Sequence, residues 1–346
     1  MRLTNDPVLS QMVDVYAAIY GDHYALTERA MAPAMETVRS DLERLAIQPD
    51  ALARMTVFNI GTGREAAAFH RLGAKRIVHA DLSPLAVRSM LALAARAPGH
   101  SRIHSVRLDI CKPGTQVAQG CRIDLAYLNG VLHHLYDPAT ALRNLLPRLG
   151  DDGTLFLRFY RSGSFLFFVV DLLRRFIGID DRATFTALTA DGATLHDDSD
   201  PWLYSDLYDD LFVPVLKLIP PDKLDAFMAS CGFAPALPAE LAPAYDHGPG
   251  TDAFVAAAYR RASDGPSDGP PSEFPASVDQ LHGIRYRDAT HLETIEVAQD
   301  VVQRIARLDA GTRIRAAISI YRLARDNGMS AAERHRALRD LLREAT

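Results

Sequence analysis

Cysteine is scarce in this chain, with three residues among 346: Cys111, Cys121 and Cys231. They form no Cys-x-x-Cys pair and no spacing typical of a metal site, so we expect no metal and free thiols in a reducing compartment. No uncharged apolar run is long enough to span a bilayer. The first residues, MRLTNDPVLS, hold no apolar signal-peptide core. These absences predict a cytoplasmic protein without stable membrane insertion.

The chain also has no excess of basic residues. Lys and Arg number 38 against 43 Asp and Glu, giving a net charge of −5. This balance offers no electrostatic reason to expect a nucleic-acid partner. The contents of 48% hydrophobic and 23% charged residues are ordinary for a globular protein. The length suffices for a full α/β core and a small second unit.

One stretch organises the chain, VFNIGTGREAAAFHRLGAKRIVHAD, which ends at Asp81. The apolar run 55–60 predicts a buried strand that is cut off by the glycine turn Gly61–Gly63. A helix pattern follows to Leu72, and a second apolar run, 76–80, ends on Asp81. This order predicts a βαβ nucleotide cradle in which backbone approaches the ligand and the carboxylate accepts hydrogen bonds from a ribose.

Strand and helix patterns then alternate along the chain. A helix is expected after Ser83-Pro84, another after Pro138 and another over 220–231. This alternation predicts an α/β fold with a Rossmann-like, doubly wound, seven-stranded sheet, in which the last two strands form an edge hairpin. The expected strands are 55–60, 76–80, 102–108, 122–128, 154–160, 233–238 and 252–259.

Helical patterns precede the cradle, in residues 1–50. Tyr16, Tyr20 and Tyr24 recur every four residues and so share one helix face. Two interpretations stay open: a packing stripe, or a helix over the open end of the cradle with one phenol touching the ligand.

We expect a domain over residues 51–261. Within it, 161–215 interrupts the alternation, and we expect a lid insertion that begins with an amphipathic helix at Phe165 and includes an aromatic, acidic loop at 204–210. Residues 262–275, rich in Gly, Pro and Ser, predict a flexible linker. The C-terminal region, 276–346, predicts helices with a thin apolar stripe, which must be buried against the main domain or a second copy of the chain; a homodimer is therefore possible.

At this point the chain resembles the class I S-adenosylmethionine-dependent methyltransferases over about residues 50–260. The glycine motif, Asp81, Asp109 and the block LAYLNGVLHHLYDP all stand in the order typical of that family. The segment LLPRLGDDGTLFL, in which we expect a turn at Gly150–Gly153, also resembles the family's next helix, turn and strand. The resemblance implies that fold, methyl transfer as the activity and S-adenosyl-L-methionine as the cofactor.

The resemblance also implies roles for matching positions. The glycine loop would pass beneath the methionine part of the cofactor, Asp81 would bind the ribose diol, and Asp109 with Ile110 would edge the adenine. The implied cofactor-binding residues are Asn59, Gly61, Thr62, Gly63, Asp81, Leu82, Asp109, Ile110, Asn129, Gly130 and Tyr20. Two positions depart from the family pattern: Asn59 replaces the usual acid, and Glu65 replaces the usual third glycine. We expect weaker or differently shaped contacts there, without loss of binding.

A methyl acceptor that is a hydroxyl or a protonated amine must lose a proton near neutral pH. Histidine suits this task by its ordinary pKa. His133 or His134, directly after the fourth strand, is the expected base, with Tyr160 and Asp206 in reserve.

The expected function is methyl transfer to a hydroxyl or amine of a small molecule. The apolar run at Phe165 leaves a lipid-like acceptor open, and the long lid leaves a peptide open. A cofactor-binding protein without methyl transfer is a further alternative, because of Asn59 and Glu65. DNA amine methylation is disfavoured because LNGVLHH lacks the Asn/Asp-Pro-Pro-aromatic signature, and a nicotinamide dehydrogenase because the third glycine is missing.

Overall fold

The computed structural model describes residues 7–19, 26, 28–96, 102–161, 164–190, 203–241, 254–263, 265, 273–274, 289–326 and 329–344. The chain forms two compact units. The sheet unit comprises Met1–Tyr160, Val215–Glu240 and Val255–Ser277. The helical unit comprises Arg161–Pro214, Leu241–Phe254 and Val278–Thr346.

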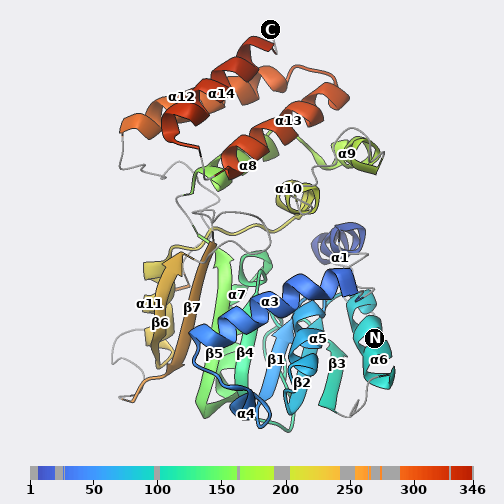
Figure 1. Ribbon diagram of the computed structural model, residues 1–346, viewed down its shortest axis with the longest axis vertical. Helices are drawn as coiled ribbons and strands as arrows, with labels where there is room; N and C mark the ends of the chain where they lie inside the picture. Colours follow the sequence, from blue (N-terminus) through green and yellow to red (C-terminus); the bar gives the residue numbers. More distant parts are fainter. Residues whose placement is uncertain are drawn as a thin grey trace. The chain divides into compact units, whose positions relative to one another are not determined.

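The described strands join in one sheet, in the order β3-β2-β1-β4-β5-β7-β6 (Figure 1). Strands β1 to β5 pair in parallel, with Val57 opposite Ile77 in β2 and opposite Leu125 in β4. The predicted doubly wound, seven-stranded sheet and its edge pair are therefore confirmed. The strands are β1 Thr56–Ile60, β2 Arg76–Asp81, β3 Ile103–Arg107, β4 Ile123–Asn129, β5 Leu149–Tyr160, β6 Phe233–Leu241 and β7 Phe254–Arg261.

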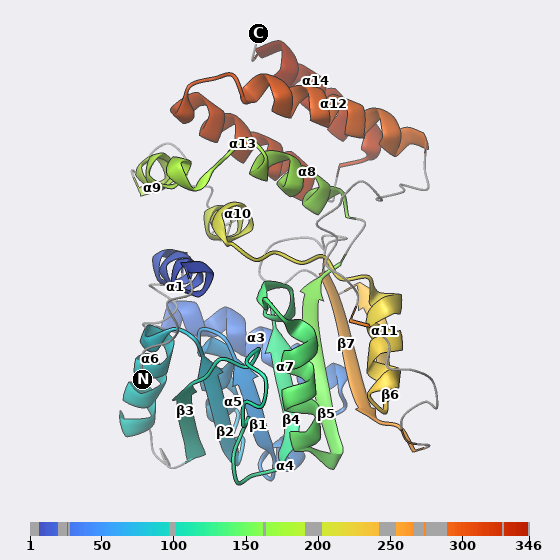
Figure 2. The same ribbon diagram turned by 180° about the vertical axis from the view of Figure 1, so that it is seen from behind.

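Helices cover both faces of this sheet. α3 and α5 lie over one face in Figure 1, and α7 lies over the opposite face in Figure 2. The helices of the sheet unit are α1 Pro7–Ile19, α3 Glu28–Arg44, α4 Pro49–Leu52, α5 Arg64–Arg71, α6 Pro84–Arg96, α7 Pro138–Leu145 and α11 Pro221–Ser230.

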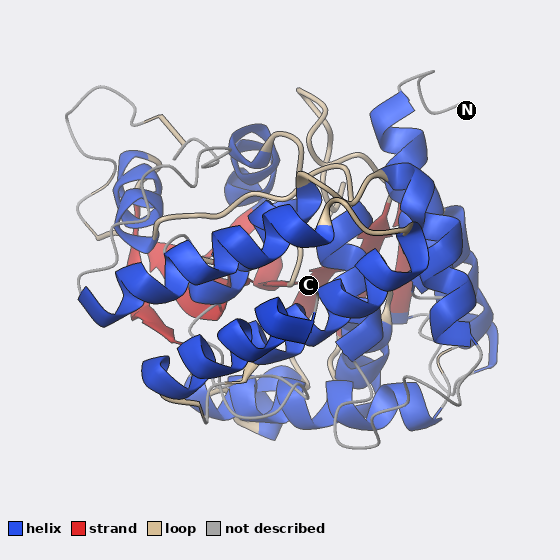
Figure 3. Ribbon diagram, turned by 90° about the horizontal axis from the view of Figure 1, so that it is seen from above, coloured by secondary structure: helices blue, strands red, loops and turns tan. Residues whose placement is uncertain are grey.

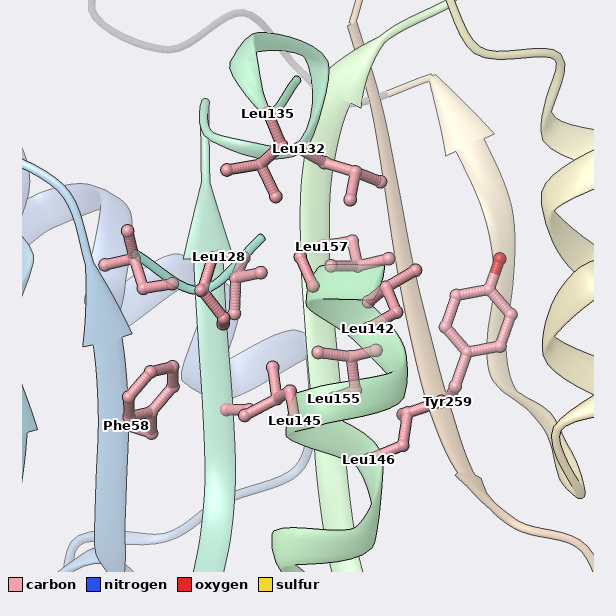
Figure 4. Packing of buried hydrophobic residues seen from close by; sticks show 14 of the residues in the cluster. Phe58, Leu128, Leu132, Leu135, Leu142, Leu145, Leu146, Leu155, Leu157 and Tyr259 are labelled. Atoms are coloured by element: carbon pink, nitrogen blue, oxygen red, sulfur yellow. The ribbon is translucent and has the colours of Figure 1, made fainter. Parts of the chain in front are cut away.

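The main core lies between the sheet and α7 (Figure 4). Phe58 on β1, Leu157 on β5 and Leu142 on α7 are all fully buried. Each such side chain contributes about 1.5–3 kcal/mol through burial. The core strands read as nearly continuous apolar runs because helices cover them on both faces.

The expected turn at Gly150–Gly153 is wrong, since these residues belong to β5. The strand is irregular there: the pairing shifts so that Ile123 faces Leu149 and Leu125 faces Thr154. A Cβ at Gly153 would lie 2.9 Å from the carbonyl oxygen of Ile123. The glycines therefore allow a bulge in β5 close to the backbone of Ile123. A pair of glycines in a sequence fits such a bulge as well as it fits a turn.

The described residues of the helical unit form helices (Figure 3). The expected helix at Phe165 is present as α8, but its first part has no exposed polar face, because all residues of the run Phe165–Val170 are buried. The expected loop at 204–210 is a helix, α10. These helices are α8 Phe165–Arg174, α9 Arg182–Ala190, α10 Leu203–Phe212, α12 Ala289–Ile305, α13 Ala310–Arg325 and α14 Ala331–Glu344.

The C-terminal helices pack against the insertion. Their apolar stripe includes Ile314 and Ile318, which are buried on α13, and α13 contacts α8, α9 and α10. The Tyr321 hydroxyl donates a 2.7 Å hydrogen bond to Asp210. The insertion, which belongs to the predicted domain 51–261, therefore supplies apolar surface that covers the stripe, and the homodimer stays a prediction.

The predicted linker lies mostly outside the described residues. Phe274, near its end, is described, and its ring packs edge-on against Phe227 at 5.1 Å between centroids. This part of the segment is thus attached to the sheet unit.

Candidate active site

The order of the strands reverses between β1 and β4, and parallel α/β sheets bind ligands at the carboxyl ends of the strands beside such a point. The loop after β1 has the left-handed backbone that glycine allows, with φ of 132° at Gly61 and 96° at Gly63. Gly63 is the N-cap of α5. A Cβ on Gly63 would approach the Met90 side chain to 2.7 Å. The loop is therefore held tightly against α6 and offers open backbone at the edge of the sheet.

His79 on β2 supports this loop, and sequence reasoning missed it. Its Nε2 lies 2.8 Å from the Gly61 carbonyl oxygen and its Nδ1 lies 2.8 Å from Ser105 Oγ. Because a carbonyl only accepts, Nε2 carries the proton and Nδ1 accepts from the serine. Burial lowers the pKa of His79 to about 4. A buried histidine inside an apolar strand pattern, eighteen residues after the glycine it supports, was the available signal.

Asp81 ends β2, where the sequence predicted a ribose-binding acid. The Ser83 backbone N–H donates to its Oδ1 at 2.6 Å. Loss of hydration raises the pKa of Asp81 to about 7, although this hydrogen bond opposes the rise. Leu82, next to it, uses its carbonyl to accept a 2.9 Å hydrogen bond from Arg107 Nε. Asp81 is half-buried at the carboxyl end of β2, and its role as the ribose ligand stays a prediction.

The loops after β3 and β4 are joined at Asp109. The Tyr136 hydroxyl donates to Asp109 Oδ2 at 2.8 Å, and the Cys111 N–H donates to Oδ1 at 3.0 Å. The same environment raises the pKa of Tyr136, chiefly by burial and then by the hydrogen bond to Asp109. Lys217 Nζ donates to the Tyr136 carbonyl at 2.8 Å. Sequence reasoning missed Tyr136 and Lys217, because only the fold brings Tyr136 to Asp109 and Lys217 to Tyr136.

The two departures from the family pattern lie on either side of the glycine loop. Asn59 is fully buried, and its Nδ2 donates to the Tyr127 carbonyl at 3.1 Å. Its Oδ1 is buried without a hydrogen-bond partner among the described residues. Glu65, in the first turn of α5, is also buried and accepts a 3.1 Å hydrogen bond from Asn129 Nδ2. Gly130 follows with φ of 65°.

The two adjacent histidines have different environments. His133 is fully buried and stacks on the Tyr160 ring at 3.6 Å, and its Nδ1 accepts a hydrogen bond from the Tyr160 N–H at 3.1 Å. Burial first, and then the neighbouring His134, lowers its pKa well below the usual value. His134 Nδ1 lies 3.1 Å from the Val215 carbonyl oxygen. Its ring meets the rings of Tyr16 and Tyr160 edge-on, each at 5.9 Å.

Two further candidates, Asp206 and Tyr20, stay predictions. Asp206 lies on α10 of the helical unit, where Arg325 NH1 donates to its Oδ2 at 2.8 Å. Tyr20 lies outside the described residues, and of the tyrosine stripe only Tyr16 is described.

Residues 58–157 match the family of the methyltransferase domain. Similar solved structures include magnesium protoporphyrin IX methyltransferase from Synechocystis PCC 6803 with bound SAH, at 15% identity and a TM-score of 0.43, covering 72% of this chain and 94% of that one. Another is 1,6-didemethyltoxoflavin-N1-methyltransferase from Burkholderia thailandensis, at 17% identity and a TM-score of 0.43, covering 76% and 93%. A third, the trans-methyltransferase CalH complexed with SAH, has 19% identity and a TM-score of 0.39, and the match covers 63% of this chain but 55% of that one. No curated protein sequence matches the chain.

The strand order and the glycine loop beside Asp81 are those of a Rossmann-like sheet, in which ligands bind at the carboxyl ends of the strands. The matched segment, residues 58–157, contains these features and is similar to the methyltransferase domain family, and S-adenosylmethionine is the cofactor that the resemblance implies. The described residues fit this cofactor: Gly61 leaves its Cβ position open, with only Val131 within 4 Å at 3.9 Å. Among the described residues, no helix is both long and apolar enough to cross a membrane.

Proposed function

We propose that this chain transfers a methyl group to a hydroxyl or amine of a small molecule, with His134 as the general base. S-adenosylmethionine supplies an electrophilic methyl on a positively charged sulfur, which leaves as a neutral thioether. The protein must then align the acceptor with that methyl and remove the acceptor's proton. His134 follows β4 at the carboxyl edge of the sheet, and β4 lies next to β1, which carries the glycine loop; this position supports the proposal.

The hydrogen bond from His134 to Val215 is the observation that carries this proposal. A carbonyl oxygen only accepts, so His134 Nδ1 carries the proton and Nε2 holds the basic lone pair. In His133 the roles are reversed, because the Tyr160 N–H donates to Nδ1. His133 is also a weak base, since burial lowers its pKa. We therefore assign proton removal to His134 and the positioning of its ring to His133 and Tyr160.

The test uses S-adenosylmethionine with a trideuterated methyl group and a mixture of small metabolites. The wild-type protein is expected to produce a compound whose mass shows H replaced by CD3, with one equivalent of S-adenosylhomocysteine. His134→Gln is expected to lower kcat by about 10²–10⁴-fold. It should leave the affinity for S-adenosylhomocysteine unchanged. An unchanged kcat would contradict the role of His134.

The lipid-like acceptor loses its motivation, because Phe165–Val170 is buried within the helical unit. The peptide acceptor and the lid function of 161–215 remain proposals. Hydrogen exchange that becomes slower over 164–190 and 203–212 when both cofactor and acceptor are present would support a lid. Equal exchange in both states would contradict it.

A further inference from the structure

Glu65 places a buried carboxylate at a position where nucleotide-binding folds usually have a ligand phosphate. It lies in the first turn of α5, directly after the glycine loop. The N-terminus of a helix favours negative charge, and in dinucleotide-binding folds the pyrophosphate binds there. In this chain the site already holds a carboxylate. It therefore disfavours an anionic ligand and favours a cationic one.

One oxygen of Glu65 is available to such a ligand. Oε1 accepts the hydrogen bond from Asn129 at 3.1 Å and lies 4.0 Å from Arg64 NH2. No described residue donates a hydrogen bond to Oε2, and Oε2 is not among the fully buried polar atoms. The Asn129 amide thus fixes the orientation of the carboxylate through one oxygen and leaves the other for a donor.

Asn59 does not provide an alternative negative charge. Its side chain is neutral and fully buried, and its amide donates to the carbonyl of Tyr127. Its Oδ1, although without a partner among the described residues, has no access to solvent. Glu65, and not Asn59, therefore supplies the acidic side chain next to the glycine loop.

We propose that Glu65 Oε2 binds the α-ammonium group of S-adenosylmethionine. The ligand has two cationic centres. Its sulfonium is next to the ribose carbon, whereas its ammonium is at the far end of the methionine chain. Asp81 ends β2, while Glu65 is bonded to Asn129 at the end of β4, and these strands flank β1 on opposite sides. If Asp81 holds the ribose, the group that reaches Glu65 is the distant ammonium. This inference rests on the assignment of the cofactor and is independent of the acceptor and of His134.

Calorimetry with three ligands tests the inference. The ligands are S-adenosylhomocysteine, its analogue lacking the α-amino group, and 5′-methylthioadenosine, which lacks the whole amino-acid part. Glu65→Gln is expected to raise the dissociation constant of S-adenosylhomocysteine by about tenfold or more, the usual scale for a hydrogen bond to a charged group. The deaminated analogue should bind wild-type protein correspondingly weakly, and Glu65→Gln should not weaken it further. The affinity for 5′-methylthioadenosine should not change.

Glu43→Gln, which alters an exposed carboxylate on α3, is the matched control and should change none of these affinities. Asn129→Ala is a second variant. It should weaken the binding of S-adenosylhomocysteine alone, by a smaller factor, because Glu65 is then no longer held in its orientation.

The wild-type protein is itself informative, since equal affinity for S-adenosylhomocysteine and for its analogue without the α-amino group would overturn the proposal. An equal loss for 5′-methylthioadenosine would show a structural role instead. A loss for S-adenosylmethionine without a loss for S-adenosylhomocysteine would assign Glu65 to the sulfonium. None of these affinities depends on the methyl acceptor or on His134. They would therefore stay the same if the proposed acceptor class or the role of His134 were wrong.

Discussion

The hydroxyl of Tyr127 donates a 2.7 Å hydrogen bond to Asp41 Oδ2, while Arg158 Nη2 lies 2.5 Å from Oδ1 of the same carboxylate. All three side chains are nearly fully buried. Tyr127 is on β4, Arg158 on β5 and Asp41 on α3, so this cluster fixes the N-terminal helix α3 on one face of the sheet. Burial raises the pKa of Asp41 even though Arg158 and Tyr127 lower it. Burying these charges therefore costs free energy on folding, and removing one partner leaves the other buried without its counter-charge.

Asp41→Asn is expected to destabilise the sheet unit by about 3–5 kcal/mol, because it removes the charge that faces the buried Arg158 guanidinium. Tyr127→Phe removes one hydrogen bond and should cost less, about 1–3 kcal/mol. Urea denaturation followed by circular dichroism measures both values. A smaller loss for Asp41→Asn than for Tyr127→Phe would contradict the importance of the ion pair.

The affinity for S-adenosylhomocysteine is expected to rise as the pH rises through about 7, the pKa of Asp81 in the free protein. The ionised carboxylate offers both oxygens as acceptors and makes stronger, charge-assisted hydrogen bonds to the ribose hydroxyls than the protonated acid does. Asp81→Asn should bind more weakly at high pH, by about 1–3 kcal/mol, and should lose this pH dependence. Calorimetry at several pH values measures the effect, and a pH-independent wild-type affinity would speak against Asp81 as the ribose ligand.

The same shift has a consequence for the stability of the free protein. The folded pKa of Asp81, about 7, lies above the ordinary value of 3.8, so the folded state binds the proton more tightly. The contribution of Asp81 to the free energy of unfolding is therefore full below pH 3.8 and is lost as the pH rises to about 7. Asp81→Asn should remove this slope in denaturation experiments, and a slope of unchanged size would assign it to other groups.

Gly63→Ala is expected to destabilise the protein through two separate effects. An L residue at φ of 96° costs about 1–2 kcal/mol. The Cβ would also clash with Met90 at 2.7 Å, and overpacking of this kind typically adds about 1–3 kcal/mol. Gly73→Ala is the matched control, because Gly73 has φ of 91° and nothing within 4 Å of its Cβ position. Equal losses of unfolding free energy in the two variants would show that Met90 moves without cost.

Arg325→Met is expected to loosen the helical unit and to leave the sheet unit intact. The side chain of Arg325 is nearly buried and its guanidinium pairs with Asp206, so the variant leaves a partly buried carboxylate without this partner. Hydrogen exchange in α8 and α10 should become faster, while exchange in β1 and β4 stays the same. Arg343→Met, at an exposed pair with Asp340, is the control and should have little effect. Faster exchange in β4 would show that the two units do not unfold separately.

Truncation after Ala262 is expected to leave the affinity for S-adenosylhomocysteine within a factor of a few. It removes α12–α14 and so exposes the apolar surface of α8, whose residues Phe165–Val170 are buried in the whole chain. The truncated protein should therefore show a loss of helical signal beyond that of the removed residues, together with self-association in light scattering. A folded, monomeric truncated protein that cannot bind the cofactor would place the C-terminal helices in the active site.

The sequence by itself determined the cradle, because its parts follow one another within about thirty residues. A strand, a glycine turn and a strand ending on Asp81 leave a pattern that periodicity and glycine chemistry can read. The regular alternation of strands with helices predicted a doubly wound sheet, while the order of its strands came from the structure. The bulge at Gly150–Gly153 was misjudged because glycine serves turns and close backbone contacts alike.

Only the tertiary structure decided which distant side chains meet. Glu65 and Asn129 are separated by 64 positions, and Asp41 and Arg158 by 117, and neither pair leaves a local pattern. The sequence predicted helices before and after the sheet domain, but not that α8 and α13 cover each other, since an apolar helix face does not specify its partner. The distinction between His133 and His134 also depended on the fold. The Nδ1 of His133 accepts a hydrogen bond from a backbone N–H, whereas the Nδ1 of His134 lies against a carbonyl oxygen, so the two rings carry their protons on different nitrogens.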